Sequence, residues 1–168
     1  YKGVLYDLQV FAQGKRVIIR DEQSIQLWNF EDGTPIRIRI PGAVVRQYHL
    51  SPSTPLIAFG TGDDTFFFDA EKGEEFARAQ GAGISRNMLG IATTPFSPDG
   101  NWFVVESKSP SRLEILDVYS PTYNRSTLAF QGARLALVWS PTSEFVAVVS
   151  TDQVPPPGEF SPDKIRSA

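Results

Sequence analysis

Short apolar runs separated by turn-forming residues dominate the pattern along this chain. Four such runs, rich in β-branched and aromatic residues, occupy residues 17–19, 56–59, 103–105 and 145–149. Runs of this length and composition, bounded by Gly, Pro, Asp and Ser, are typical of buried β-strands. The pattern therefore predicts an all-β chain of short strands joined by tight turns.

The apolar runs recur with a period. The dipeptide Ser-Pro precedes three of them, at Ser51-Pro52, Ser97-Pro98 and Ser140-Pro141. The interval is about 45 residues, which is within the range of known structural repeats. Because the first run follows residues 12–15 in the same relative place, we infer four copies of one structural unit.

A second element follows each of the first three runs. It is a strand-like segment that ends in Asn29, Asp69 or Asp117 and leads into a turn. Another candidate strand follows two of these turns, at residues 35–40 and 74–79. The second of these favours a helix by intrinsic propensity, but its place in the repeat predicts an outer strand. Each unit is thus expected to hold four short antiparallel strands.

The repeats divide the chain into units at about residues 1–42, 43–82, 83–132 and 133–152. We expect the last unit to be incomplete, because Pro155, Pro156 and Pro157 lack the amide donor that a central strand needs. Residues 153–168 are predicted to form a Pro-rich loop or tail.

These motifs resemble the repeats of WD40-like β-propeller proteins. The matching pieces are Leu-Trp-Asn at 27–29 and Ile-Leu-Asp at 115–117, where the family has Trp-Asp, and the turns at 96–100 and 139–141. The family's Gly-His dipeptide is missing and His49 is the single histidine, so the family's network of His, Asp, Ser and Trp cannot be complete. The resemblance implies a partial β-propeller of four-stranded antiparallel blades.

A propeller has four to eight blades and closes into a ring that removes exposed sheet edges. Three and a half blades leave such edges open, and the sequence begins at Tyr1. We therefore expect a part of a larger propeller, or a ring that a second copy or a partner chain completes. The resemblance also implies other proteins as partners, because propellers of this type chiefly present loops and a flat face to them.

Composition and charge narrow the classes of function. The net charge is −3, from 16 basic and 19 acidic residues. This charge disfavours a nucleic acid as the partner, because nucleic-acid-binding proteins usually carry a basic patch. Every apolar run is far shorter than the roughly 18 residues of a membrane helix, so we expect no membrane partner. The absence of cysteine favours an intracellular, cytoplasmic protein, although the triplet Asn124-Arg125-Ser126 would be a glycosylation acceptor in a secreted chain.

The sequence contains few residues that are candidates for catalysis or metal binding. His49 stands without a second histidine or a cysteine, so we interpret it as structural and expect neither a metal nor a cofactor. The arginines at 16, 20, 37, 39 and 46 could form a basic stripe. Charged residues at alternating positions are, however, more typical of a strand face exposed to solvent. We expect no enzymatic activity.

The sequence offers one preferred contact region for a protein partner. It is the polar connection at residues 81–87, with Ile84, Arg86 and Asn87 available for contact, and the acidic pair Asp63-Asp64 is a second candidate. Binding residues concentrate on loops carried by a rigid scaffold. The acidic pair lies in a Gly-rich turn, and Asp residues are common in turns for structural reasons alone.

Three functions remain open at this point. The first is a non-enzymatic protein-interaction scaffold, part of a larger propeller in a multiprotein assembly. The second is a non-catalytic propeller subdomain of a larger enzyme such as a peptidase, since TolB-like propellers share the Ser-Pro-Asp-Gly turn. The third is an RNA-associated or translation-factor-like propeller, which would recognise RNA through its arginines; the Pro-rich interruption is similar to that in propellers of eukaryotic translation initiation factors.

Overall fold

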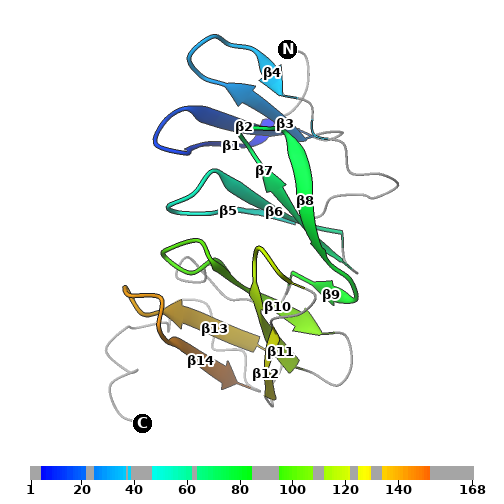
Figure 1. Cartoon of the computed structure of the whole chain (residues 1–168), viewed down its shortest axis with the longest axis vertical. Helices are drawn as coiled ribbons and strands as arrows, with labels where there is room; N and C mark the ends of the chain where they lie inside the picture. The colour runs from blue at the N-terminus through cyan, green and yellow to red at the C-terminus, as the bar shows by residue number, and fades with distance from the viewer. Residues whose placement is uncertain are drawn as a thin grey trace.

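A computed structural model of the chain describes residues 5–21, 25–36, 38, 47–61, 64–84, 95–107, 112–121, 125–129 and 134–151. These residues form four antiparallel sheets, which follow one another in chain order along the long axis of the molecule (Figure 1). Within the same ranges, no helix is long and apolar enough to cross a membrane.

Three of the sheets have four strands and the last has two. Sheet 1 contains β1 (Leu5–Phe11), β2 (Arg16–Asp21), β3 (Ile25–Asn29) and β4 (Pro35–Ile36). Sheet 2 contains β5 (Gln47–Leu50), β6 (Leu56–Gly60), β7 (Thr65–Asp69) and β8 (Glu74–Ala79). Sheet 3 contains β9 (Ala82–Gly83), β10 (Trp102–Ser107), β11 (Arg112–Asp117) and β12 (Arg125–Ala129). Sheet 4 contains β13 (Arg134–Trp139) and β14 (Val146–Thr151).

The helix-prone segment after Asp69 forms the outer strand β8, as the repeat predicts. Pairing with β7 supplies its backbone hydrogen bonds, and this tertiary context overrides propensity. The predicted unit boundary between residues 82 and 83 falls inside β9, because Ala82 pairs with Ser107 of sheet 3. The other two predicted boundaries and the predicted tail lie outside the described residues.

A hydrophobic core lies between each pair of consecutive sheets. The core between sheets 2 and 3 has the most buried residues among those described and includes Phe67, Phe96 and Phe103. The core between sheets 1 and 2 includes Phe66 and Phe68, and a smaller third core joins sheets 3 and 4. Because successive strand residues point to opposite faces, the three neighbouring phenylalanines of β7 serve two different cores.

The repeated Ser-Pro motifs form equivalent turns. In each motif the serine N–H donates a hydrogen bond to the carbonyl oxygen five residues later: Ser51 to Leu56 at 3.0 Å, Ser97 to Trp102 at 2.9 Å, and Ser140 to Phe145 at 2.8 Å. At the other repeated position, side-chain oxygens of Asn29, Asp69 and Asp117 accept from the N–H two residues on. These side-chain turns are a common use of Asn and Asp.

Sheets of antiparallel strands stacked face to face in chain order are the blades of a β-propeller. The described part of the chain is therefore all-β and forms a partial β-propeller, which confirms the predicted fold class. Its three described four-stranded sheets are compatible with a WD40-like arrangement.

The Ser-Pro turns of neighbouring sheets also touch one another. The N–H of Asp99 in sheet 3 donates to Ser143 Oγ in sheet 4 at 3.0 Å. On the other side, a Cβ at Gly100 would lie 2.5 Å from Ser51 Oγ and 2.7 Å from Thr54 Oγ1 in sheet 2. Any Cβ added at Gly100 would therefore require the side chains of Ser51 and Thr54 to move, at a positive φ that L-residues rarely adopt.

We predict that Gly100→Ala lowers the free energy of unfolding by about 2–4 kcal/mol, because it adds overpacking to the strain of a positive φ. Gly33→Ala is the matched control, since Gly33 has a similar φ but no atom within 4 Å of the added Cβ, and it should lose only about 1 kcal/mol. Urea denaturation of both variants measures the difference. Equal losses would contradict the turn-to-turn contact.

Candidate functional site

Two described segments that the sequence singled out for contact lie on one rim of the stacked sheets. Strand connections alternate between two rims, and the Ser-Pro turns occupy one of them. The opposite rim holds the β6–β7 turn and the connection that leaves β8. We call the described residues Thr61, Asp64 and 80–83 of this opposite rim the Asp64 rim, after the residue that joins its two segments.

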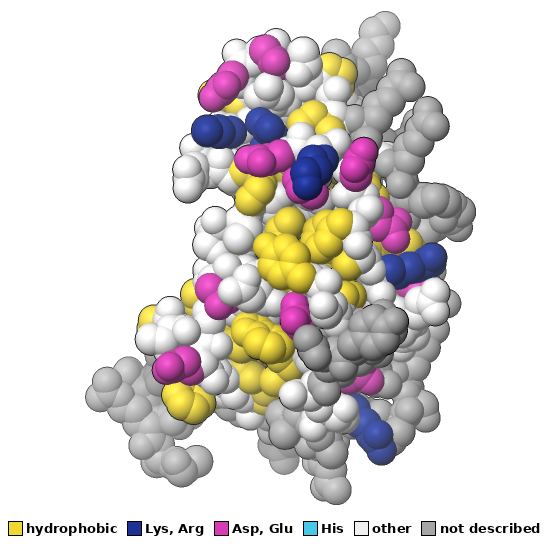
Figure 2. Space-filling model, viewed as in Figure 1, with side chains coloured by type: hydrophobic (Ala, Val, Ile, Leu, Met, Phe, Trp, Pro, Cys, Tyr) yellow, Lys and Arg dark blue, Asp and Glu magenta, His cyan; other side chains and the backbone are white. Residues whose placement is uncertain are grey.

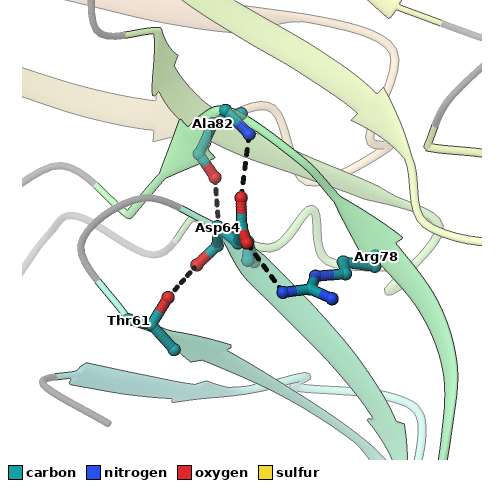
Figure 3. Close-up of polar contacts among 6 residues, drawn as sticks. Thr61, Asp64, Arg78 and Ala82 are labelled. Atoms are coloured by element: carbon teal, nitrogen blue, oxygen red, sulfur yellow. Dashed lines mark hydrogen bonds and ion pairs between the residues drawn. The ribbon is translucent and has the colours of Figure 1, made fainter. Parts of the chain in front are cut away.

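Asp64 ties the two segments together (Figure 3). Its Oδ1 accepts a hydrogen bond from the N–H of Gly81 at 2.9 Å, and its Oδ2 lies 2.8 Å from Nη2 of Arg78. Its backbone oxygen accepts from the N–H of Thr61 at 3.1 Å, which closes the β6–β7 turn. One side chain thus joins a turn, an outer strand and the connection to the next sheet.

The neighbouring contacts strengthen this arrangement. The guanidinium carbon of Arg78 lies 4.3 Å from the centroid of the Phe66 ring, a cation–π contact that contributes about 0.5–1 kcal/mol at an exposed site. The buried hydroxyl of Thr65 donates to the carbonyl oxygen of Ala82 at 2.9 Å. The Asp64–Arg78 pair is partly exposed, so its own contribution is below about 1 kcal/mol.

Ile84 does not take the place that the sequence predicts for it. It is 6% exposed and belongs to the core between sheets 2 and 3, so its availability for contact was a wrong prediction. The physical reason is that residues 82–83 form β9 instead of a loop, and Ile84 fills the space above Gly60, whose added Cβ would come within 3.0 Å of it. Asp63, Arg86 and Asn87 lie outside the described residues.

His49 lies on the inner strand β5, with its ring centroid 6.4 Å from that of Phe103. Desolvation by burial lowers the pKa of His49 from 6.5 to about 4, so the imidazole is neutral at pH 7. Among the described residues, no group of three potential ligands could hold a metal ion. The geometry places this histidine in a sheet-to-sheet contact, next to an aromatic ring.

The predicted arginine stripe is only partly described. Arg16 donates to the carbonyl oxygen of Ala70 and to Oδ1 of Asn29, both at 3.2 Å, and the first of these bonds links sheet 1 to sheet 2. Arg37, Arg39 and Arg46 lie outside the described residues. On the face drawn in Figure 2, basic and acidic side chains are interspersed instead of forming a patch of one sign.

Sequence reasoning missed one polar contact between the first two inner strands. The hydroxyl of Tyr48 donates to Oδ2 of Asp7, and Nε2 of Gln9 donates to the same oxygen at 2.9 Å. Burial, together with the hydrogen bond and the charge of Asp7, raises the pKa of Tyr48 above its usual value. No repeat marks these residues, so only their spatial closeness could have revealed the contact.

We predict that Asp64→Ala lowers the free energy of unfolding by about 1–2 kcal/mol, because the Gly81 N–H loses its acceptor. Asp64→Asn is the matched control, because its amide oxygen can still accept that bond and only the ion pair is lost, worth less than about 1 kcal/mol. Hydrogen exchange of the Gly81 amide should accelerate in the alanine variant alone. The same acceleration in both variants would show that Asp64 does not hold this connection.

We predict a pH-dependent loss of stability from His49. Between pH 6.5 and 4 the unfolded chain binds a proton at this residue and the folded chain does not, so stability falls as the pH is lowered through that window. The loss is at most about 3 kcal/mol, from the difference of the two pKa values. Urea denaturation of the wild type and of His49→Gln at pH 7 and pH 4.5 isolates this residue, because the carboxylates are common to both. An unchanged pH dependence in the variant would rule out the effect.

Comparisons with known proteins give structural likenesses only. No protein-family model matches the sequence, and no curated protein matches it either. A chain in the crystal structure of a mitotic checkpoint complex is similar in structure, with a TM-score of 0.57 and 16% identity over 89% of this chain and 47% of that chain. A functionally unknown protein from Desulfotomaculum acetoxidans matches with a TM-score of 0.52 and 20% identity, over 89% of this chain and 50% of that one.

The chain thus spans about half the length of the solved chains that it resembles. At these identities the likeness shows the fold alone, which is a partial β-propeller.

Proposed function

We propose that this chain is a non-enzymatic protein-interaction scaffold that forms part of a larger propeller in a multiprotein assembly. The observation that carries the proposal is the Asp64 rim, where one carboxylate holds a turn and an inter-sheet connection in one arrangement. Prearranged loops on stacked sheets bind a partner at a low entropic cost, because little ordering is needed on binding.

The described candidate groups, Asp64 on this rim and His49 on β5, support binding better than catalysis. General acid–base and nucleophilic chemistry need two groups within hydrogen-bond reach of each other and of a substrate. The Asp64 carboxylate is already bonded to Arg78 and Gly81, and His49 is neutral against an aromatic ring. These groups stabilise the scaffold, and a partner would contact the loops that they position.

The character of the surface and the structural likeness support a protein as the partner. Charges of both signs are interspersed on the face in Figure 2, which suits a polypeptide of mixed charge better than a polyanion. One similar chain belongs to a mitotic checkpoint complex, a multiprotein assembly by its name. By analogy of fold alone, this supports a place for the present chain in an assembly of proteins.

Site-specific photocrosslinking tests the proposal. A crosslinker at Gln80, which is exposed on the Asp64 rim, should capture a discrete partner, which is then purified. The double variant Arg86→Ala/Asn87→Ala should weaken binding of that purified partner by about 10-fold or more, the size of a typical contact residue. Titration calorimetry with the full chain measures the change.

The opposite rim supplies the control. Ser53 and Glu71 are exposed in turns of that rim, and Ser53→Ala and Glu71→Ala should leave the affinity unchanged. If these two variants weaken binding while the double variant does not, the contact surface is on the Ser-Pro rim. If purified chain instead turns over a substrate, the non-enzymatic proposal is wrong.

A further inference from the structure

An exposed pair of aromatic residues, Phe76 and Tyr119, joins the two middle sheets. Phe76 lies on β8, the outer strand of sheet 2, and Tyr119 lies in the turn that follows β11 of sheet 3 (Figure 1). Their ring centroids are 5.8 Å apart and the rings are inclined at 31°. Phe76 is 39% exposed and Tyr119 is 56% exposed, so both rings contact solvent although both sheets are covered on their two faces by the cores.

A β-bulge turns Phe76 toward sheet 3. In the ladder between β7 and β8, Phe67 pairs with Ala77 and Phe68 pairs with Glu75, so Phe76 is an extra residue without an opposite partner. Ala77 packs against the same core as Phe67. Strict alternation would point Phe76 to the other face of the sheet, whereas its ring centroid lies 6.5 Å from that of Phe67. The bulge therefore adds a second side chain to a face that Ala77 already covers.

The exposed pair is anchored in the aromatic core. The rings of Phe67 and Phe103 are buried, with their centroids 5.3 Å apart. From these two rings the contacts continue through Phe76 to Tyr119. Rings held in this way lose little freedom when a ligand stacks on them. The face of an aromatic ring attracts a guanidinium or ammonium group, so the exposed pair is suited to a cation.

Glu74 provides a carboxylate on the same face of sheet 2. It lies opposite Asp69, two positions along β7 from Phe67, and residues directly opposite each other point to the same face. Glu74 is exposed and forms no ion pair with any described residue, whereas Asp69 lies 3.3 Å from Nζ of Lys72. Two carboxylates directly opposite each other destabilise a strand pair, and a cation beside Glu74 would relieve this.

Arg78 shows how this chain holds a cation between the same kinds of group. Its guanidinium carbon lies 4.3 Å from the centroid of the Phe66 ring, and its Nη2 lies 2.8 Å from Oδ2 of Asp64. An aromatic ring and a carboxylate thus contact one guanidinium group. The exposed aromatic pair and Glu74 offer the same combination, without a cation from the described residues.

We propose that Phe76, Tyr119 and Glu74 form a docking surface for a basic peptide segment of a partner protein; we call it the Tyr119 surface. An arginine or lysine side chain of the peptide stacks on the aromatic pair, and Glu74 neutralises its charge. A purely apolar segment would leave this carboxylate desolvated without a partner, and a polyanion would be repelled by it. The inference goes beyond the proposed rim contact, because none of these three residues belongs to the Asp64 rim.

Titration of the isotope-labelled full chain with a synthetic peptide, followed by nuclear magnetic resonance, tests the inference. The probe is Gly-Arg-Ala-Arg-Gly, blocked at both ends. Its control carries citrulline in place of arginine, which keeps the shape of the side chain and removes the charge. The arginine peptide should shift the amide signals of residues 74–77 and 118–120, with a dissociation constant of about 1 mM or less. The citrulline peptide should bind about 10-fold more weakly or not at all.

Two neighbouring glutamates separate a local contact from general attraction. Glu74→Gln should raise the dissociation constant of the arginine peptide by about 5-fold or more, because it removes the charge beside the aromatic pair. Glu75→Gln is the matched control. Glu75 lies opposite Phe68, which belongs to the core between sheets 1 and 2, so its carboxylate is on the other face of the sheet. This variant should change the dissociation constant by less than about 2-fold.

A second pair of variants tests the aromatic contact. Tyr119→Leu keeps an apolar side chain but removes the ring, and it should raise the dissociation constant by about 5-fold or more. Phe30→Leu is the control, because Phe30 is also an exposed aromatic residue, at 66%, but lies in a turn of sheet 1. Its affinity for the peptide should equal that of the wild type. The spectra of all four variants also show whether each remains folded.

Equal effects of the two glutamate variants would mean attraction by net charge alone and would overturn the inference. Equal binding of the arginine and citrulline peptides would do the same. If a second copy or another segment of the protein covers the aromatic pair, the peptide leaves the signals of residues 74–77 and 118–120 unchanged, and the inference is wrong. Crosslinking at Gln80 reports on the Asp64 rim separately, so failure of either proposal leaves the other standing.

Discussion

The packing of one sheet face on the next is the constraint on which this structure depends. Each sheet has two faces, and in the middle of the chain both are apolar, as the neighbouring Phe66, Phe67 and Phe68 show. A strand buried on both sides reads as a continuous apolar run, and all five residues of β6 are buried. The turns then need only to reverse the chain, and their hydrogen bonds repeat from sheet to sheet.

The same constraint explains how much of the fold could be predicted from sequence. The Ser-Pro turns and the residues Asn29, Asp69 and Asp117 gave a period, and the period placed strands where propensity alone was ambiguous, as in β8. Ile84 was misplaced because a two-residue strand, β9, leaves no pattern in the sequence. The contact between Tyr48 and Asp7 joins different repeats, so no local sequence pattern predicts it.

The candidate site, too, was predicted from the sequence only in part. The sequence indicated both segments of the Asp64 rim, but their connection through Asp64 and the Gly81 N–H follows only from the sheet topology. The packing of the sheets holds the two rim segments at definite positions, and Asp64 joins them.

The central claim is that consecutive sheets pack face to face through the three hydrophobic cores. Hydroxyl-radical footprinting with mass spectrometry tests this directly, by comparing the oxidation of Phe103, which is buried between sheets 2 and 3, with that of Phe30, which is 66% exposed. The account predicts that Phe103 is protected while Phe30 is oxidised freely. Oxidation of both phenylalanines at similar rates would contradict it.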